Sequence, residues 1–228
     1  MFTTRERLVI FDADGTLVDA FGAIDETFAE HGMRIGDLER FQKRRALFKY
    51  LGGLREFPGN LRKQFGKRRR QELLATLTEV YRERGTLYPG MSDLLNLLIK
   101  TPGVRVGLVS RNVTNEAELT LERLFERNGV DFSGIDYLAC IPLRDSKLPF
   151  FRVVREQFGI NPAHSFVCGD EHKDYAAATA AGMNPLIVSY GFEGFERLTT
   201  KFDVPPEVVS RTPEEFRARV LHTLDLLS

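Results

Sequence analysis

The fold of this chain and the place of its chemistry are decided by one stretch, LVIFDADGT, at residues 8–16. Four apolar residues predict a short buried strand, and the glycine after the acidic pair predicts a turn. In an extended backbone, residues i and i+2 point to the same face, so Asp12 and Asp14 would both lie over one site at the strand's carboxyl end. Open α/β sheets bind their ligands at that edge.

Asp12 and Asp14 repel each other when both are ionised. Such a pair is made tolerable by a bound cation, by a shared proton, or by opposed roles as acid and base. A solvated acidic turn is the plainer alternative, because Asp and Gly are common turn residues. The remainder of the chain decides between these interpretations.

Polar side chains recur where other predicted strands end. Ser110, Lys147 and Asp170 each come at, or shortly after, the end of an apolar run. Asp174 follows four residues after Asp170 and opens an alanine-rich run that favours a helix. Taken singly, Ser110 would be a loop hydroxyl, Lys147 a surface charge and Asp174 a helix cap. Their order after Asp12 favours one shared site.

Apolar patterning predicts an α/β protein. Strands are expected at 7–12, 104–110, 137–141, 165–169, 185–189 and, less distinctly, 207–210. Helices are expected between them at 91–100, 115–128, 149–158 and 213–227. Strands separated by helices argue for a doubly wound parallel sheet that is covered on both faces.

The segment between the first two predicted strands has a different pattern. No clear strand occurs between Val18 and Leu87, and helices are predicted at 23–30, 38–51 and 61–84. The sequence YPG at 88–90 marks the return to the sheet, because Pro and Gly break the preceding helix. An insert placed after the acidic turn can close over a ligand and exclude water.

Taken together, the motifs resemble those of the haloacid dehalogenase superfamily. That family places Asp-x-Asp-Gly-Thr, a Ser or Thr, a Lys and Gly-Asp-x-x-x-Asp on successive strand ends, which matches residues 12–16, Ser110, Lys147 and 169–174. The sequence YGF at 190–192 is similar to a loop of the phosphoglycolate phosphatase-like members.

The resemblance also implies a division of the chain. Residues 1–19 and 88–228 would form a Rossmann-like catalytic core, and residues 20–87 would form a helical cap domain. The expected fold class is therefore α/β, a doubly wound parallel sheet with a helical cap.

The resemblance implies an enzyme, a phosphoric monoester hydrolase. Asp12 would be the nucleophile that forms an aspartyl-phosphate. Asp14 would protonate the leaving alcohol and then activate water, and an acid at this position argues for phosphoryl transfer instead of dehalogenation. Ser110 and Lys147 would bind the oxygens of the transferring phosphoryl group.

The implied cofactor is Mg²⁺, which prefers oxygen ligands and keeps substrate phosphate in its coordination shell. Asp12 and Asp170 would supply carboxylate ligands, and the main-chain carbonyl of Asp14 would be a third ligand. Asp174 would orient the metal or its waters. Helix capping is the other role expected for Asp174, and the two roles can coexist.

The expected substrate is a small phosphorylated metabolite, and three arginines are candidates to bind it. Arg111 directly follows Ser110, where a guanidinium could grip a second anionic group; an outward-facing arginine is the alternative. Arg55 and Arg62 flank an expected turn at 57–60, which could reach the site when the cap closes.

Basic residues are concentrated in the predicted cap. The formal net charge is zero, yet residues 39–70 contain twelve Lys or Arg and two acidic residues. A solvated helix face is the plain explanation, and recognition of an anionic substrate or of nucleic acid is the alternative. Two other functions therefore stay open beside the phosphatase: a phosphomutase acting on a sugar phosphate, and a nucleic-acid-binding protein that uses the basic cap.

Composition sets outer limits on the function. With 228 residues, 43% of them hydrophobic and 28% charged, the chain resembles an ordinary globular protein. No run approaches the roughly 18 apolar residues of a membrane span, and residues 1–7 hold no apolar signal core, so we expect no membrane partner and a cytoplasmic location. Cys140 and Cys168 lie in apolar runs, and the four histidines lack metal-ligand spacing, which argues against zinc.

Overall fold

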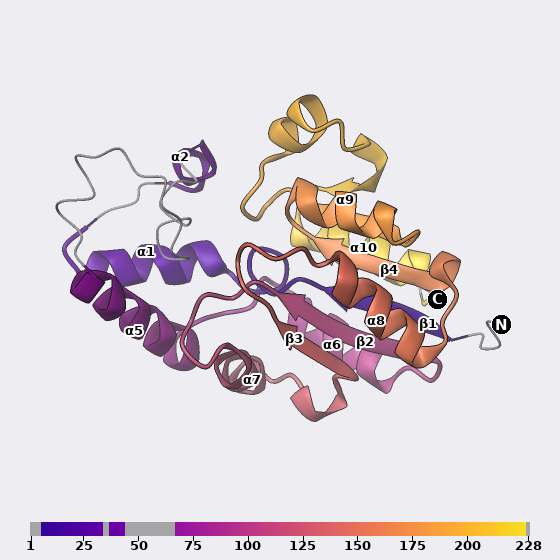
Figure 1. The fold of residues 1–228 in the computed structure, drawn as a ribbon, viewed down its shortest axis with the longest axis horizontal. Coiled ribbons are helices and arrows are strands. Elements are labelled where there is room, and N and C mark those ends of the chain that lie inside the picture. Colours follow the sequence, from indigo (N-terminus) through magenta and orange to yellow (C-terminus); the bar gives the residue numbers. More distant parts are fainter. Residues whose placement is uncertain (1–5, 34–36, 44–66, 227–228) are drawn as a thin grey trace.

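The computed structural model describes residues 6–33, 37–43 and 67–226, arranged around one sheet (Figure 1). All neighbouring strands of the sheet are parallel, in the order β3-β2-β1-β4-β5-β6. The six strands are β1 (Arg7–Phe11), β2 (Val104–Ser110), β3 (Tyr137–Cys140), β4 (Ser165–Gly169), β5 (Asn184–Val188) and β6 (Val209–Ser210). The doubly wound parallel sheet expected from the sequence is confirmed.

The strand order reverses between β1 and β4. The first three strands are added from the centre of the sheet to one edge, in the order β1, β2, β3. The last three are added from the centre to the other edge, in the order β4, β5, β6. Such a reversal leaves a crevice at the carboxyl ends of the two central strands. The acidic pair that follows β1 is therefore placed at the switch point of the sheet.

Helices cover both faces of the sheet. One face carries α6 (Met91–Lys100), α7 (Ala117–Arg127) and α10 (Pro213–Thr223), and the other carries α8 (Leu148–Phe158) and α9 (His172–Ala180). Strand β1 contributes side chains to the hydrophobic cores on both faces of the sheet. Val9 packs in the core on the α6, α7 and α10 face, and Ile10 packs in the core on the α8 and α9 face. A strand buried on both faces explains why residues 8–11 are continuously apolar.

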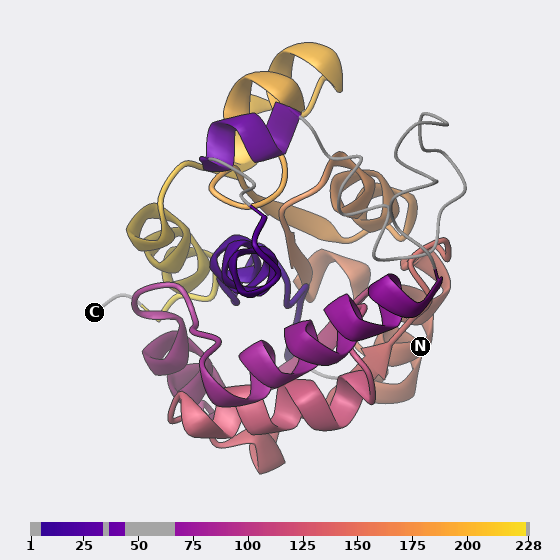
Figure 2. The same ribbon diagram turned by 90° about the vertical axis from the view of Figure 1, so that its left-hand side faces the viewer.

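The segment between β1 and β2 is helical in its described part, with α1 (Ala20–Glu30), α2 (Leu38–Lys43) and α5 (Lys67–Glu83). Helix α1 packs along α5, and α5 packs along α7 of the core (Figure 2). Helix α1 begins three residues earlier than the pattern predicts. The cause is Asp19, whose carboxylate accepts a hydrogen bond from the Gly22 N–H at 2.9 Å and caps the helix.

The two connections between this segment and the sheet run side by side. Val18 and Leu87 form an antiparallel bridge, and the Asp19 N–H donates to the Thr86 carbonyl at 2.9 Å. The assignment of residues 20–87 to a separate cap domain stays a prediction. None of the helices in the described ranges combines the length and the apolarity needed to cross a bilayer.

Candidate active site

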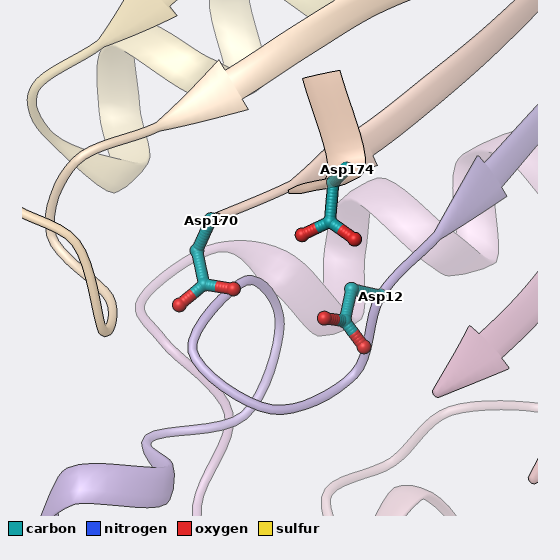
Figure 3. Close-up of side chains that lie close together, drawn as sticks. All are labelled: Asp12, Asp170 and Asp174. Carbon is teal, nitrogen blue, oxygen red and sulfur yellow. The ribbon is translucent and has the colours of Figure 1, made fainter. Parts of the chain in front are cut away.

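Three carboxylates from three parts of the chain meet at the carboxyl edge of the sheet (Figure 3). Asp12 follows β1, Asp170 follows the neighbouring strand β4, and Asp174 lies in the first turn of α9. One oxygen from each lies within 4.8 Å of the others. All three side chains are buried, so their charges are poorly screened by water.

Lys147 is the cation of this cluster. Its Nζ lies 2.6 Å from Asp12 Oδ2 and 2.8 Å from Asp174 Oδ1, and the side chain is 3% exposed. Burial raises the pKa of Asp12, and the Lys147 charge opposes that effect. Burial, followed by the charges of Asp12 and Asp174, raises the pKa of Asp170 well above its ordinary value. Lys147 and the nearby Arg111, which is paired with Glu171, therefore leave an excess of negative charge on the three carboxylates.

The cluster fits a divalent cation. Asp170 Oδ2 accepts a hydrogen bond from the Phe192 N–H at 2.6 Å, whereas its Oδ1 is buried and has no hydrogen-bond partner among the described residues. An unpaired buried carboxylate oxygen carries a large desolvation cost, which a coordinated cation would offset. The donor atoms are all oxygens, the type that Mg²⁺ prefers.

Asp174 also caps a helix, as expected. Its Oδ2 accepts a hydrogen bond from the Glu171 N–H at 3.1 Å in the first turn of α9. Glu171 in turn binds Arg111, whose Nη2 lies 3.8 Å from Asp174 Oδ1. The Arg111 side chain is only 9% exposed and faces the loop between β4 and α9, not solvent. Its role as a substrate ligand stays a prediction.

Two glycines let other loops approach Asp170. A Cβ on Gly15 would lie 2.3 Å from Asp170 Oδ2, and the φ of Gly15 is +80°, which favours glycine. A Cβ on Gly191 would lie 2.2 Å from the Gly15 carbonyl oxygen and 2.5 Å from Asp170 Oδ2. The turn after Asp12 and the loop at 190–193 are thus packed directly against the Asp170 carboxylate.

Ser110 ends β2, next to the acidic turn. Leu108 pairs with Phe11 in the sheet, so Ser110 continues beyond that pair at the same edge as Asp12. Ser110 is fully buried, and its hydroxyl oxygen has no hydrogen-bond partner among the described residues. The same is true of the hydroxyl of Thr16 in the acidic turn. Both hydroxyls are available to oxygens of a bound anion.

Asp14 has different neighbours from Asp12. Its Oδ1 accepts hydrogen bonds from the Tyr81 hydroxyl at 2.9 Å and from Asn112 Nδ2 at 3.2 Å, and its Oδ2 lies 3.0 Å from the same nitrogen. Burial and then the Asp12 charge raise the pKa of Asp14 to about 7. A carboxyl group with such a pKa can give and take a proton near neutral pH.

Sequence reasoning missed both partners of Asp14. Asn112 could have been found from its place two residues after Ser110, in a loop at a strand end. Tyr81 carries no such signal, because it looks like an ordinary apolar-face residue of a helix. Only the packing of α5 brings its hydroxyl to Asp14.

A cavity of about 360 Å³ adjoins Lys147 and Asp174. Its polar lining includes the basic side chains of Arg111, Arg144 and Lys173. Arg55 and Arg62, the other predicted substrate-binding residues, lie outside the described residues. So does the predicted turn between them.

Comparison with known proteins decides the family. The family model of haloacid dehalogenase-like hydrolases matches residues 6–182. The chain belongs to the haloacid dehalogenase-like hydrolases. The match spans the acidic pair and every other strand-end residue discussed above, from Asp12 to Asp174.

Curated relatives of this hydrolase include several phosphoglycolate phosphatases. Phosphoglycolate phosphatase 1 of Pseudomonas aeruginosa is 30% identical over 207 residues, covering 84% of this chain and 72% of that protein. The phosphoglycolate phosphatase of Rhodospirillum rubrum is 27% identical over 205 residues, covering 82% and 80%. The prediction of an enzyme, a phosphoric monoester hydrolase of this superfamily, is confirmed.

Solved structures support the fold. A haloacid dehalogenase-like family protein of Streptococcus pneumoniae matches with a TM-score of 0.61 at 20% identity, covering 94% of this chain and 98% of that one. CbbY of Rhodobacter sphaeroides, solved in complex with phosphate, matches with a TM-score of 0.57 at 18% identity, covering 82% and 88%.

Proposed function

We propose that this hydrolase is a magnesium-dependent phosphatase that cleaves a small phosphomonoester through an aspartyl-phosphate on Asp12. The observation that carries the proposal is the buried cluster of Asp12, Asp170 and Asp174 around Lys147, with Asp14 held beside it. A scaffold protein has no use for three buried carboxylates that share one lysine, because their burial costs stability.

The side chains divide the work of two steps. In the first, an Asp12 oxygen attacks phosphorus, the bond from phosphorus to the leaving oxygen breaks, and Asp14 gives its proton to that oxygen. In the second, water loses a proton to Asp14 as its oxygen attacks phosphorus, and the bond to Asp12 breaks. Lys147 and Ser110 bind the phosphoryl oxygens, where negative charge develops.

Asp12, Asp170 and Asp174 would hold Mg²⁺, with the main-chain carbonyl of Asp14 as a further ligand. When bound, Mg²⁺ supplies positive charge that lets an anionic carboxylate approach an anionic phosphoryl group. Lys147 supplies the only other cation that contacts Asp12 in the described part of the chain. The three carboxylates would therefore supply the nucleophile, Asp12, and also hold the cation that lets Asp12 approach the anionic phosphoryl group.

The proposed substrate is 2-phosphoglycolate or a similarly small phosphomonoester that carries a second anionic group. Two observations support this choice. The relatives are named phosphoglycolate phosphatases. The cavity beside Lys147 is small and carries Arg111, Arg144 and Lys173, which suits a compact anion. We retain the cytoplasm as the expected location of such a metabolic enzyme.

A phosphate-release screen tests this function. Purified protein would be offered 2-phosphoglycolate, other small phosphomonoesters and p-nitrophenyl phosphate, each with Mg²⁺ and with EDTA. We expect release that requires the metal and is absent from Asp12→Asn, which keeps the shape of the side chain but cannot attack phosphorus. Isomerisation of a sugar phosphate without net phosphate release would favour a phosphomutase, and equal activity in EDTA would contradict the metal.

A further inference from the structure

One helix outside the catalytic sheet reaches the centre of the site. Tyr81 lies on α5, in the segment between β1 and β2, and its side chain is 2% exposed. Its hydroxyl donates to Asp14 Oδ1 at 2.9 Å. None of the family motifs contains this residue, and the two-step reaction described above does not use it.

The position of Tyr81 is fixed by its neighbours along α5. One turn earlier, the Thr78 hydroxyl accepts a hydrogen bond from the Asn115 N–H at 2.9 Å. The next residue, Arg82, donates from Nε to the Thr120 hydroxyl at 3.0 Å. These contacts tie α5 to the segment that leads from Ser110 into α7. The phenol therefore keeps its place relative to the strand ends.

The second donor to Asp14 is also held in one orientation. Asn112 Oδ1 accepts hydrogen bonds from the Thr114 N–H, at 2.9 Å, and from the Thr114 hydroxyl. Because the Asn112 oxygen is occupied, its Nδ2 faces Asp14. Asp14 Oδ1 thus receives one donor from α5 and one from the loop after β2, and Oδ2 receives one from that loop.

We propose that Tyr81 is a positioning residue that fixes the carboxyl plane of Asp14 so that Oδ2 is the oxygen that exchanges the proton with the leaving group and with water. The inference rests on the proposed phosphatase function. Asn112 alone contacts both oxygens through one nitrogen and leaves the carboxyl group free to tilt. Tyr81 binds Oδ1 only and so distinguishes the two oxygens. Tyr81 keeps its own proton in both steps.

The test separates the two chemical steps by the choice of leaving group. p-Nitrophenolate leaves without a proton, so formation of the phosphoenzyme from p-nitrophenyl phosphate needs no acid, whereas its hydrolysis still needs Asp14 as base. An alkyl phosphate such as 2-phosphoglycolate needs Asp14 in both steps. Tyr81→Phe removes only the hydroxyl, and Tyr137→Phe on β3 is the matched control away from Asp14.

We expect Tyr81→Phe to keep a rapid burst of p-nitrophenolate, within about threefold of the wild-type burst rate, while steady-state turnover falls about tenfold to a hundredfold. With the alkyl substrate, the first step should slow by a similar factor. Tyr137→Phe should match the wild type in both assays, and thermal unfolding should show that both variants are folded.

Two results would overturn the inference. A Tyr81→Phe enzyme with wild-type turnover on the alkyl substrate would show that the hydroxyl does not position Asp14. A variant that loses the burst and the steady state equally would show a general structural role instead. Failure of the proposed function would look different, because the wild type would then form no phosphoenzyme and Asp12→Asn would have no effect.

Discussion

Asp12 and Asp14 have the same side chain and lie two residues apart, yet their surroundings give them separate roles. Asp12 contacts Lys147, whose charge opposes the effect of burial on the Asp12 pKa and so favours the ionised carboxylate that a nucleophile needs. Asp14 faces the uncharged donors Tyr81 and Asn112, and burial raises its pKa to about 7. Two carboxylates whose surroundings differ in this way are suited to different roles in proton transfer.

This separation predicts the behaviour of Asp14→Asn. We expect turnover of an alkyl phosphate to fall by roughly 10²–10⁴-fold, because the amide can neither donate the proton nor accept it from water. With p-nitrophenyl phosphate, the phosphoenzyme should accumulate, since only its hydrolysis is blocked. Mass spectrometry of the intact protein after an acid quench would measure this. An unmodified protein with unchanged kinetics would contradict the role of Asp14.

How far the sequence predicted the site depends on where each residue lies. Asp12, Ser110 and Asp170 come at the ends of apolar strands, and a parallel sheet gathers such ends at one edge. Their placement at one edge was predictable from the apolar runs that precede them and from the parallel arrangement of the strands. Tyr81 did not, because the docking angle of a helix on its neighbour depends on side-chain packing along its whole length.

At the scale of elements, the loop at 190–193 packs against Asp170, one of the proposed metal ligands. The Phe192 N–H binds Asp170 Oδ2, and Gly191 has no room for a Cβ beside that oxygen. Gln42 of α2 reaches the same loop, since its Nε2 donates to the Gly191 carbonyl at 2.7 Å. The loop therefore joins the segment between β1 and β2 to Asp170, a proposed metal ligand.

Gly191→Ala should displace Asp170 and so weaken metal binding. We expect the Mg²⁺ concentration for half-maximal activity to rise about tenfold or more, with a smaller loss of rate at saturating metal, because outer contacts of ligands tune metal affinity. Gly107→Ala on β2 is the matched control, since the nearest atom to its Cβ would be at 3.6 Å, an ordinary contact. An unchanged Mg²⁺ requirement in Gly191→Ala would show that the loop at 190–193 does not position Asp170 for metal binding.

The elements themselves were largely predictable. All six strands begin and end within two residues of the predicted spans, because continuous apolar runs bounded by turn residues are characteristic of buried parallel strands. The start of α1 was missed because one side chain, Asp19, adds a cap before the apolar periodicity begins. Helix ends depend on such single contacts.

At the scale of the whole molecule, the buried carboxylates of the candidate metal site lower the stability of the metal-free protein. Burial and neighbouring charges raise the pKa of Asp170 in the folded state above its ordinary value of 3.8. The folded protein therefore holds this proton to higher pH than the unfolded chain does. The resulting stability is fully present below the ordinary pKa and is lost as pH rises through the higher folded-state pKa.

Asp170→Asn should consequently stabilise the metal-free protein near neutral pH. Its amide oxygen can still accept from the Phe192 N–H, and it carries no charge. In EDTA at pH 7.5 we expect an unfolding midpoint roughly 2–8 °C above the wild type, a difference that shrinks as pH falls toward 4. Added Mg²⁺ should stabilise the wild type and not the variant. Calorimetry at several pH values would measure both unfolding midpoints. A lower midpoint for Asp170→Asn than for the wild type in EDTA at pH 7.5 would contradict the claim that the Asp170 charge destabilises the metal-free protein.

The central claim is that Asp12 carries the phosphoryl group, and trapping that group tests it most directly. Protein would be quenched during turnover of p-nitrophenyl phosphate, reduced with borohydride, which converts an aspartyl-phosphate to homoserine, and digested for peptide mass analysis. The account predicts homoserine at position 12 in the wild type, more of it in Asp14→Asn, and none in Asp12→Asn. Phosphate release without any modification at position 12, or with modification at another residue, would contradict the account.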